Sequence, residues 1–142
     1  MPIEPAWKVE NRPPRILIVD DDYEVADPVR FALEGLGFEV VHMPNGRSGA
    51  EKLEQYQPDL MVLDMMIPGQ SGFLVLEHLR RTKHDRIRII MVTANEGSRH
   101  ETYARTLGVD DYMHKPFPID RLVGKVQELL EKPFPAPPRE DS

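Results

Sequence analysis

The chain has 142 residues, of which 40% are hydrophobic and 30% charged, and its formal net charge is −6. This length fits a single domain with a substantial core, and the acidic balance argues against unaided binding to nucleic acid, which needs a basic patch. The absence of cysteine excludes disulfides, zinc–thiolate sites and thiol nucleophiles, and with no secretion signal or membrane-length apolar run we expect a cytoplasmic protein that does not contact a membrane.

Prolines mark both ends of the chain. Residues 1–14 are predicted to be an N-terminal extension, residues 15–132 one domain, and residues 133–142 a proline-rich C-terminal tail or linker. Closely spaced prolines hold a chain extended and prevent a helix from continuing, so neither end is expected to belong to the core. Trp7 is the exception, because its aromatic ring can pack back onto the body.

Between these ends, short apolar runs alternate with amphipathic segments. The predicted strands are residues 15–19, 38–43, 59–63, 87–92 and 109–114. The predicted helices are residues 23–35, 45–56, 71–82, 98–107 and 118–131. Three of the strands are almost continuously apolar, which is typical of strands buried on both faces of a parallel sheet. The strict alternation of strand and helix predicts an α/β fold with right-handed crossovers.

Two of the predicted helices carry local signals. Ser98 and Glu101 have the spacing of a capping box, and Gly108 is suited to end the same helix. Pro28 falls in the second turn of the first helix. Either that helix kinks at Pro28 or it restarts with Asp27 as its cap, and the continuous apolar spacing on both sides favours the kink.

The residues that follow the strands are the candidates for chemistry, because open α/β sheets bind ligands beyond the carboxyl ends of their strands. These residues are Asp20, Asp21 and Asp22 after the first strand, Asp64 after the third, Thr93 and Ala94 after the fourth, and Lys115 and Pro116 after the fifth. Separate segments thus bring carboxylates, a hydroxyl and an ammonium to one edge of the predicted sheet.

The charges at this edge indicate a magnesium site. Two carboxylates about 4 Å apart repel by ~4 kcal/mol at an effective dielectric constant near 20, so a cation is expected among the acids. The five histidines are scattered without metal-ligand spacing, and most are expected at the surface. An all-oxygen cluster suits Mg²⁺ better than zinc or copper. Asp64, facing Lys115, is then the natural nucleophile toward a phosphoryl group whose oxygens Lys115 and the Thr93 hydroxyl would neutralise.

Four motifs make the sequence resemble the receiver domain of two-component response regulators, the CheY-like family. They are "VDDD", "LDMMIPGQSG", "VTA" and "DDYMHKPF", and the resemblance extends over residues 15–132. It implies a doubly wound five-stranded parallel sheet flanked by five helices, with the flavodoxin-like strand order 2-1-3-4-5. It also implies a phosphoprotein of bacterial phosphorelay signal transduction.

The resemblance further implies which residues bind the metal and accept the phosphoryl group. Asp20, Asp21, Asp64 and the backbone carbonyl of Met66 would bind Mg²⁺. Asp64 would accept a phosphoryl group from a sensor histidine kinase or a histidine phosphotransfer protein. Asp22 is not a ligand in the family and is expected to face solvent.

The switch residues are also implied by the resemblance alone. Thr93 and Lys115 would contact the phosphoryl oxygens, the Lys115–Pro116 peptide bond would be cis, and Tyr112 would turn inward when Thr93 moves toward the phosphate. The face made by the fourth helix, fifth strand and fifth helix would dimerise or dock partners. The expected chemistry is self-catalysed phosphotransfer and autodephosphorylation, which differs from that of a conventional turnover enzyme.

Two other functions are disfavoured and one question stays open. A phosphatase of haloacid dehalogenase type needs a second acid two residues after its nucleophile, where this chain has Met66. A flavodoxin-like binder of a flavin phosphate needs hydroxyl and glycine donors where Asp20 to Asp22 would repel the phosphate. The chain is either a stand-alone receiver or a receiver fragment of a longer multidomain regulator, because its proline-rich tail suits a linker and its acidic end suits a natural terminus equally well.

Overall fold

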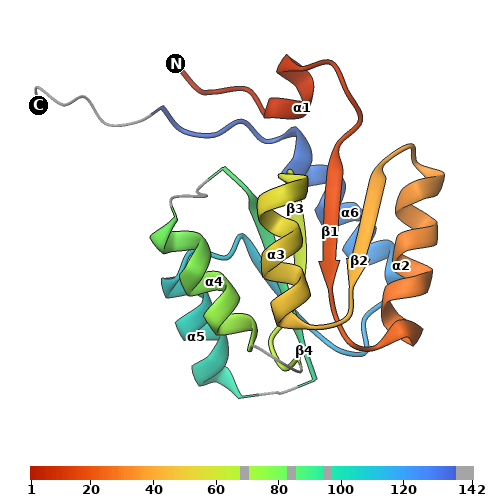
Figure 1. The fold of residues 1–142 in the computed structure, drawn as a ribbon, viewed down its shortest axis with the longest axis vertical. Coiled ribbons are helices and arrows are strands. Elements are labelled where there is room, and N and C mark those ends of the chain that lie inside the picture. The colour runs from red at the N-terminus through yellow and green to blue at the C-terminus, as the bar shows by residue number, and fades with distance from the viewer. Residues whose placement is uncertain (68–70, 83–85, 95–96, 137–142) are drawn as a thin grey trace, which may run out of the picture.

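In this computed structural model, five parallel strands form one sheet in the order β2-β1-β3-β4-β5 (Figure 1). The structure describes residues 1–67, 71–82, 86–94 and 97–136. The strands are β1 (Arg15–Val19), β2 (Glu39–Met43), β3 (Leu60–Asp64), β4 (Arg88–Thr93) and β5 (Asp111–His114). Their order and parallel pairing confirm the predicted sheet. β3 and β4 each lie one residue later than predicted, so Asp64 and Thr93 are the last residues of their strands.

The helices include one that the sequence did not predict. They are α1 (Ala6–Val9), α2 (Tyr23–Gly35), α3 (Gly46–Tyr56), α4 (Gly72–Arg81), α5 (Ser98–Thr106) and α6 (Ile119–Glu131). The short helix α1 lies in the N-terminal segment, which was predicted as an extension outside the core. Among the described residues, no helix combines the length and the apolar character that a bilayer crossing needs.

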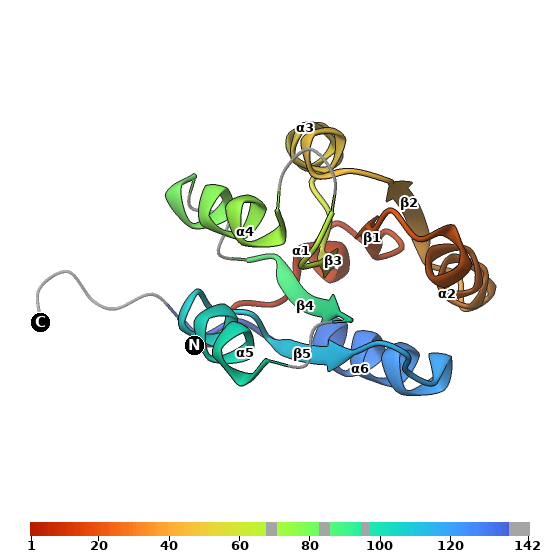
Figure 2. The same ribbon diagram turned by 90° about the horizontal axis from the view of Figure 1, so that it is seen from below.

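Helices cover both faces of the sheet, and this explains the continuous apolar runs. Successive side chains of a strand point to opposite faces. Leu17 and Val19 of β1 therefore join the core beneath α3, α4 and α5, whereas Ile16 and Ile18 join the core beneath α2 and α6 (Figure 2). Every residue of β3 is buried. The two cores hold the strands from both sides and thereby fix the edge at which the strands end.

The first predicted helix forms as a single helix, α2, with Pro28 inside it. Its N-cap is Asp22, whose side chain accepts a hydrogen bond from the Glu24 amide at 3.0 Å. An aspartate at this position satisfies a donor that the first helical turn leaves free. The helix therefore begins before Pro28, and the alternative in which it restarts at Asp27 does not occur.

The capping box predicted for the helix after β4 is wrong, whereas its predicted end is confirmed. α5 begins at Ser98 with Gly97 as the N-cap, so Ser98 lies within the helix. The Glu101 carboxylate accepts a hydrogen bond from Arg105 Nε at 3.1 Å, one turn further along. Just beyond the helix, Gly108 has a φ of +86°, a left-handed conformation that glycine adopts without a steric penalty.

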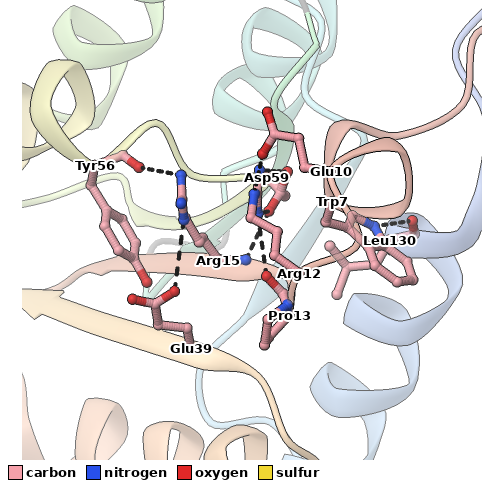
Figure 3. Close-up of polar contacts among 9 residues, drawn as sticks. All are labelled: Trp7, Glu10, Arg12, Pro13, Arg15, Glu39, Tyr56, Asp59 and Leu130. Carbon is pink, nitrogen blue, oxygen red and sulfur yellow. Dashed lines mark hydrogen bonds and ion pairs between the residues drawn. The ribbon is translucent and has the colours of Figure 1, made fainter.

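Trp7 packs back onto the body, as the sequence suggested. Its indole Nε1 donates a hydrogen bond to the Leu130 carbonyl at 3.0 Å (Figure 3). Its ring packs against the core beneath α2 and α6. The N-terminal segment is thus attached to the last helix, although the two are separated by almost the whole chain.

The start of α4 lies directly against the chain that follows β3, and only a glycine fits there. The Gly72 amide donates a hydrogen bond to the Met65 carbonyl at 2.9 Å. A Cβ atom on Gly72 would lie 2.8 Å from Met65 Cα and closer still to the Asp64 carbonyl oxygen. Because these are backbone atoms, a side chain at this position would displace the end of β3.

We predict that Gly72→Ala lowers the free energy of unfolding by about 1–3 kcal/mol, the usual cost of forcing an extra carbon into a packed position. Gly124→Ala is the matched control, because Gly124 lies in α6 with no atom within 4 Å of its Cβ position. Since alanine favours helices over glycine, that variant should gain roughly 0.5–1 kcal/mol. Urea denaturation followed by circular dichroism measures both, and equal stabilities would contradict the close packing at Gly72.

Candidate functional site

The charged residues singled out in the sequence come together at the carboxyl edge of the sheet, the lower edge in Figure 1. Asp20 directly follows β1, Asp64 and Thr93 end β3 and β4, and Lys115 directly follows β5. Because all the strands are parallel, each of them delivers its last residues to this same edge.

Asp20, Asp21 and Asp64 form an acidic cluster. Each offers a carboxylate oxygen, and these oxygens lie within 4.8 Å of one another. Asp20 is 1% exposed and Asp64 is 4% exposed, whereas Asp21 is open to solvent. Two of the three negative charges are therefore removed from water, and they need a positive partner.

The Lys115 ammonium supplies part of that positive charge. Its Nζ lies 2.8 Å from Asp20 Oδ2 and 3.0 Å from Asp64 Oδ2. The contact with Asp64 has hydrogen-bond geometry. The contact with Asp20 is an ion pair, and within the described structure Asp20 Oδ2 is a buried oxygen without a well-directed hydrogen bond. The charge of this oxygen is therefore balanced by the Lys115 ammonium.

Burial and charge act in opposite directions on the pKa values of this cluster. Burial raises the pKa of Asp64 to about 6, and the bonds from the Lys115 ammonium and the Met66 amide only partly offset it. Burial also lowers the pKa of Lys115, but its bonds and charge interactions with Asp20 and Asp64 outweigh burial, so this pKa is raised overall. Lys115 therefore stays protonated, whereas burial makes the ionised form of Asp64 less favourable than it is in water.

Backbone amides fix the remaining oxygens of both buried acids. The Asp22 amide donates to Asp20 Oδ1 at 2.9 Å, and the Met66 amide donates to Asp64 Oδ1 at 3.1 Å. Carboxylates held at close range by separate loops are the hard oxygen donors that Mg²⁺ prefers, so the residues present fit this ion. Asp22 itself is exposed, as expected. Its capping of α2 was missed, although its place directly before a helix was a sufficient signal.

His42 on the edge strand β2 also contacts the acidic loop, and sequence reasoning missed it. Its Nε2 lies 2.6 Å from the Asp20 carbonyl oxygen, and since a carbonyl can only accept, Nε2 carries the hydrogen. The Asp20 amide donates to the Met43 carbonyl at 3.1 Å, so β2 holds both backbone groups of Asp20. The signal lay in the first two predicted strands, because their parallel pairing sets His42 opposite Ile18, close to the acids.

Thr93 and Tyr112 are joined to each other inside the protein. Thr93 is fully buried and Tyr112 is 6% exposed. A side-chain hydrogen bond links the two, and the Tyr112 hydroxyl also lies 3.8 Å from Met65 Sδ. The pKa of Tyr112 is raised, chiefly by burial. The Lys115 amide donates to the Thr93 carbonyl at 2.7 Å, and the Lys115–Pro116 peptide bond is cis, as predicted.

The raised pKa of Asp64 predicts a pH-dependent stability of the metal-free protein. Its carboxyl has a pKa of 3.8 when unperturbed and about 6 in the folded protein. Between these values the folded state binds the proton more tightly than the unfolded state. The contribution of Asp64 to the free energy of unfolding is therefore fully present below about pH 4 and is lost as the pH rises to about 6.

Asp64→Asn removes this loss of stability, because the asparagine side chain stays neutral over the whole pH range. Without divalent cations, the variant should exceed the parent in free energy of unfolding at neutral pH by on the order of 1–3 kcal/mol, and the two should converge near pH 4. Urea denaturation at the two pH values measures the difference. A parent protein that is at least as stable as the variant at neutral pH would contradict the assignment.

Known proteins share the sequence pattern and the fold of this chain. The sequence pattern of the response regulator receiver domain matches residues 16–127. The chain is 38% identical over 120 residues to the DNA-binding dual master transcriptional regulator RpaA of Synechocystis sp.. It is 34% identical over 122 residues to the phosphate regulon transcriptional regulatory protein PhoB of Escherichia coli. These matches cover 84% and 85% of this chain but 50% and 53% of the two relatives, so the chain spans about half the length of the curated relatives it matches.

Solved structures share the fold. The CheY-like response regulator receiver domain protein from Methanospirillum hungatei has a TM-score of 0.78 and 30% sequence identity, covering 83% of this chain and 94% of that one. The receiver domain of Francisella response regulator 1452 has a TM-score of 0.77 and 27% identity, covering 82% of this chain and 96% of that one. Sequence and fold agree over the same region, and the chain therefore belongs to the receiver domain family of two-component response regulators.

Proposed function

We propose that this receiver domain accepts a phosphoryl group on Asp64 from the phosphohistidine of a sensor histidine kinase or a histidine phosphotransfer protein. The observation that carries the proposal is the position of Asp64. Its Oδ2 lies 3.0 Å from Lys115 Nζ, and its carboxylate lies beside two further acids within 4.8 Å. Phosphoryl transfer depends mainly on positioning and on neutralising the phosphoryl oxygens. Lys115 and a cation held by the acids would supply the positive charge.

The proposed transfer is a displacement at phosphorus. A carboxylate oxygen of Asp64 forms the new O–P bond while the P–N bond of the phosphohistidine breaks, and the electron pair of that bond returns to the imidazole nitrogen. The Lys115 ammonium and the Thr93 hydroxyl would then contact the phosphoryl oxygens. Attack of water at phosphorus would break the O–P bond to Asp64, release inorganic phosphate and return the Asp64 carboxylate. The domain would thus catalyse its own phosphorylation and dephosphorylation.

Asp20, Asp21, Asp64 and the backbone carbonyl of Met66 would hold Mg²⁺. When bound, the ion supplies positive charge that neutralises both the phosphoryl oxygens and the surrounding acids. The poorly hydrogen-bonded Asp20 Oδ2 and the raised pKa of Asp64 support this assignment. Both indicate that the cluster carries more negative charge than Lys115 alone neutralises.

Thr93 and Tyr112 would convey the phosphorylated state to the surface formed by α5, β5 and α6. A Thr93 hydroxyl drawn to a phosphoryl oxygen would lose its hydrogen bond to Tyr112 and free that ring to move. The surface carries ion pairs from Asp111 to Arg105 at 3.8 Å and to Lys125 at 3.5 Å. Partly exposed pairs of this kind contribute little to stability, so they could be exchanged for contacts with a partner or a second copy.

The response that the domain controls depends on whether it acts alone or is joined to a further domain. RpaA and PhoB are named as regulators of transcription, and this chain spans about half of their length. We propose that the chain supplies the phosphorylation-dependent part of such regulation, either alone through protein contacts or within a longer regulator. The native open reading frame beyond Ser142 decides between these two arrangements.

Phosphorylation by acetyl phosphate tests the acceptor without a kinase. We predict that the parent protein gains one phosphoryl group in the presence of Mg²⁺, because the donor needs only the acceptor carboxylate and its neutralising charges. The gain should disappear with EDTA and in Asp64→Asn. Intact-protein mass spectrometry measures it, with circular dichroism as the control for folding. Full incorporation into Asp64→Asn would count directly against the assignment.

Two neighbouring aspartates provide a matched pair for the metal site. Asp21→Ala is expected to weaken Mg²⁺ binding by roughly ten-fold or more, since it removes a direct ligand. Asp22→Ala keeps the backbone amide that binds Asp20 and loses only the cap of α2. It should lower the free energy of unfolding by about 1 kcal/mol and leave Mg²⁺ affinity near that of the parent. Isothermal titration calorimetry measures both affinities, and equal losses would show that the wrong acid was assigned to the metal.

A further inference from the structure

Two segments outside the family match meet at the end of the sheet opposite the acidic cluster, the upper end in Figure 1. Ile3 and Phe134 form an antiparallel bridge there, in which the amide of each donates to the carbonyl of the other at 2.8 Å. Phe134 is only 9% exposed, although it lies in the predicted tail. The C-terminal segment therefore starts as a buried and hydrogen-bonded part of the structure.

Arg88, the first residue of β4, is the centre of this contact. Its Nη2 donates hydrogen bonds to the carbonyls of Lys132 and Pro133 at 2.8 and 3.0 Å. Its guanidinium carbon lies 3.9 Å from the centroid of the Phe134 ring, a cation–π contact. Its Nη1 pairs with Asp110 at 3.3 Å, which neutralises the buried charge. A single side chain thus binds three consecutive residues of the tail.

The prolines of the tail leave few ways to hold it. Pro133 and Pro135 have no amide hydrogen, so between them Phe134 alone can donate a backbone hydrogen bond. The acceptor of that bond is the Ile3 carbonyl. The Ile3 carbonyl therefore accepts the one backbone hydrogen bond that residues 133–135 can donate.

Residues 3–12, which we call the strap, are anchored on two sides (Figure 3). On one side, Trp7 Nε1 donates to the Leu130 carbonyl at 3.0 Å. On the other side, two N–H groups of Arg12 bind the Asp59 carboxylate at 2.8 and 3.2 Å. Bidentate hydrogen bonds between a guanidinium and a carboxylate are among the strongest hydrogen bonds in proteins. These two anchors and the bridge to Phe134 together hold the strap on the domain.

We propose that the strap is an interaction surface for the chain's own C-terminal segment. Together with Arg88 it binds residues 132–134 and fixes the point at which the chain leaves the domain. The chain after Phe134 then departs from the end of the sheet opposite Asp64. The contacts of residues 132–134 thus set the point on the domain from which the following residues extend. This role does not depend on the proposed phosphorylation.

Hydrogen exchange at the Phe134 amide, followed by NMR in the full chain, tests the strap. Trp7→Ala removes one anchor without altering residues 132–134. We expect Phe134 to exchange about ten-fold faster or more, while amides of β3 keep their protection. Val9→Ala is the matched control, because Val9 lies in the same short helix but is 73% exposed, and it should leave Phe134 unchanged. Unchanged exchange of Phe134 in Trp7→Ala, or equal acceleration in β3, would overturn the proposal.

The reverse measurement uses the single tryptophan of the chain. Phe134→Ala removes the ring that packs against Arg88 and weakens the hold on the Phe134 backbone that pairs with Ile3, so the strap should loosen and Trp7 should become more exposed to water. We expect its fluorescence emission to shift to longer wavelength while the far-ultraviolet circular dichroism stays that of the parent. A parent-like emission spectrum in Phe134→Ala would show that the strap and the tail are not mutually dependent, and it would overturn the proposal.

Discussion

The burial of Asp20 and Asp64 around one ammonium is the constraint on which the rest of the structure depends. Two carboxylates about 4 Å apart repel by ~4 kcal/mol at an effective dielectric constant near 20. Lys115 approaches them at 2.8 and 3.0 Å, yet the pKa of Asp64 remains raised to about 6. Burial thus disfavours the ionised form of Asp64 even beside this ammonium, and the three acids have the donor atoms that the proposed Mg²⁺ site requires.

The fold keeps these repelling groups together by holding the backbone that carries them. Both backbone groups of Asp20 are bonded to β2, one of them through His42. Asp64 ends a strand that is buried on both faces, and Gly72 closes the chain tightly behind it. Because these contacts hold the main chain at Asp20 and Asp64, the two buried carboxylates stay close together despite their repulsion.

The two ends of the sheet carry different groups of residues. At the carboxyl end lie the acids, Lys115 and Thr93, which make up the proposed phosphorylation site. At the opposite end, Arg88 and the strap gather the two termini of the chain. β4 connects these ends, since it begins with Arg88 and finishes with Thr93. The receiver thus combines a site that is general to its family with a terminal arrangement that lies outside the region matched by that family.

The alternation of strands and helices, and the arrival of Asp20, Asp64, Thr93 and Lys115 at one edge, could be predicted from local periodicity and from the geometry of parallel strands. The doubly wound sheet and its strand order came from the resemblance to receiver domains. The contact of His42 with Asp20, the capping of α5 by Gly97 and the bond from Trp7 to Leu130 emerged from the folded structure alone. Trp7 and Leu130 are 123 residues apart. Such contacts depend on which surfaces meet after the sheet has closed, and no local propensity encodes that meeting.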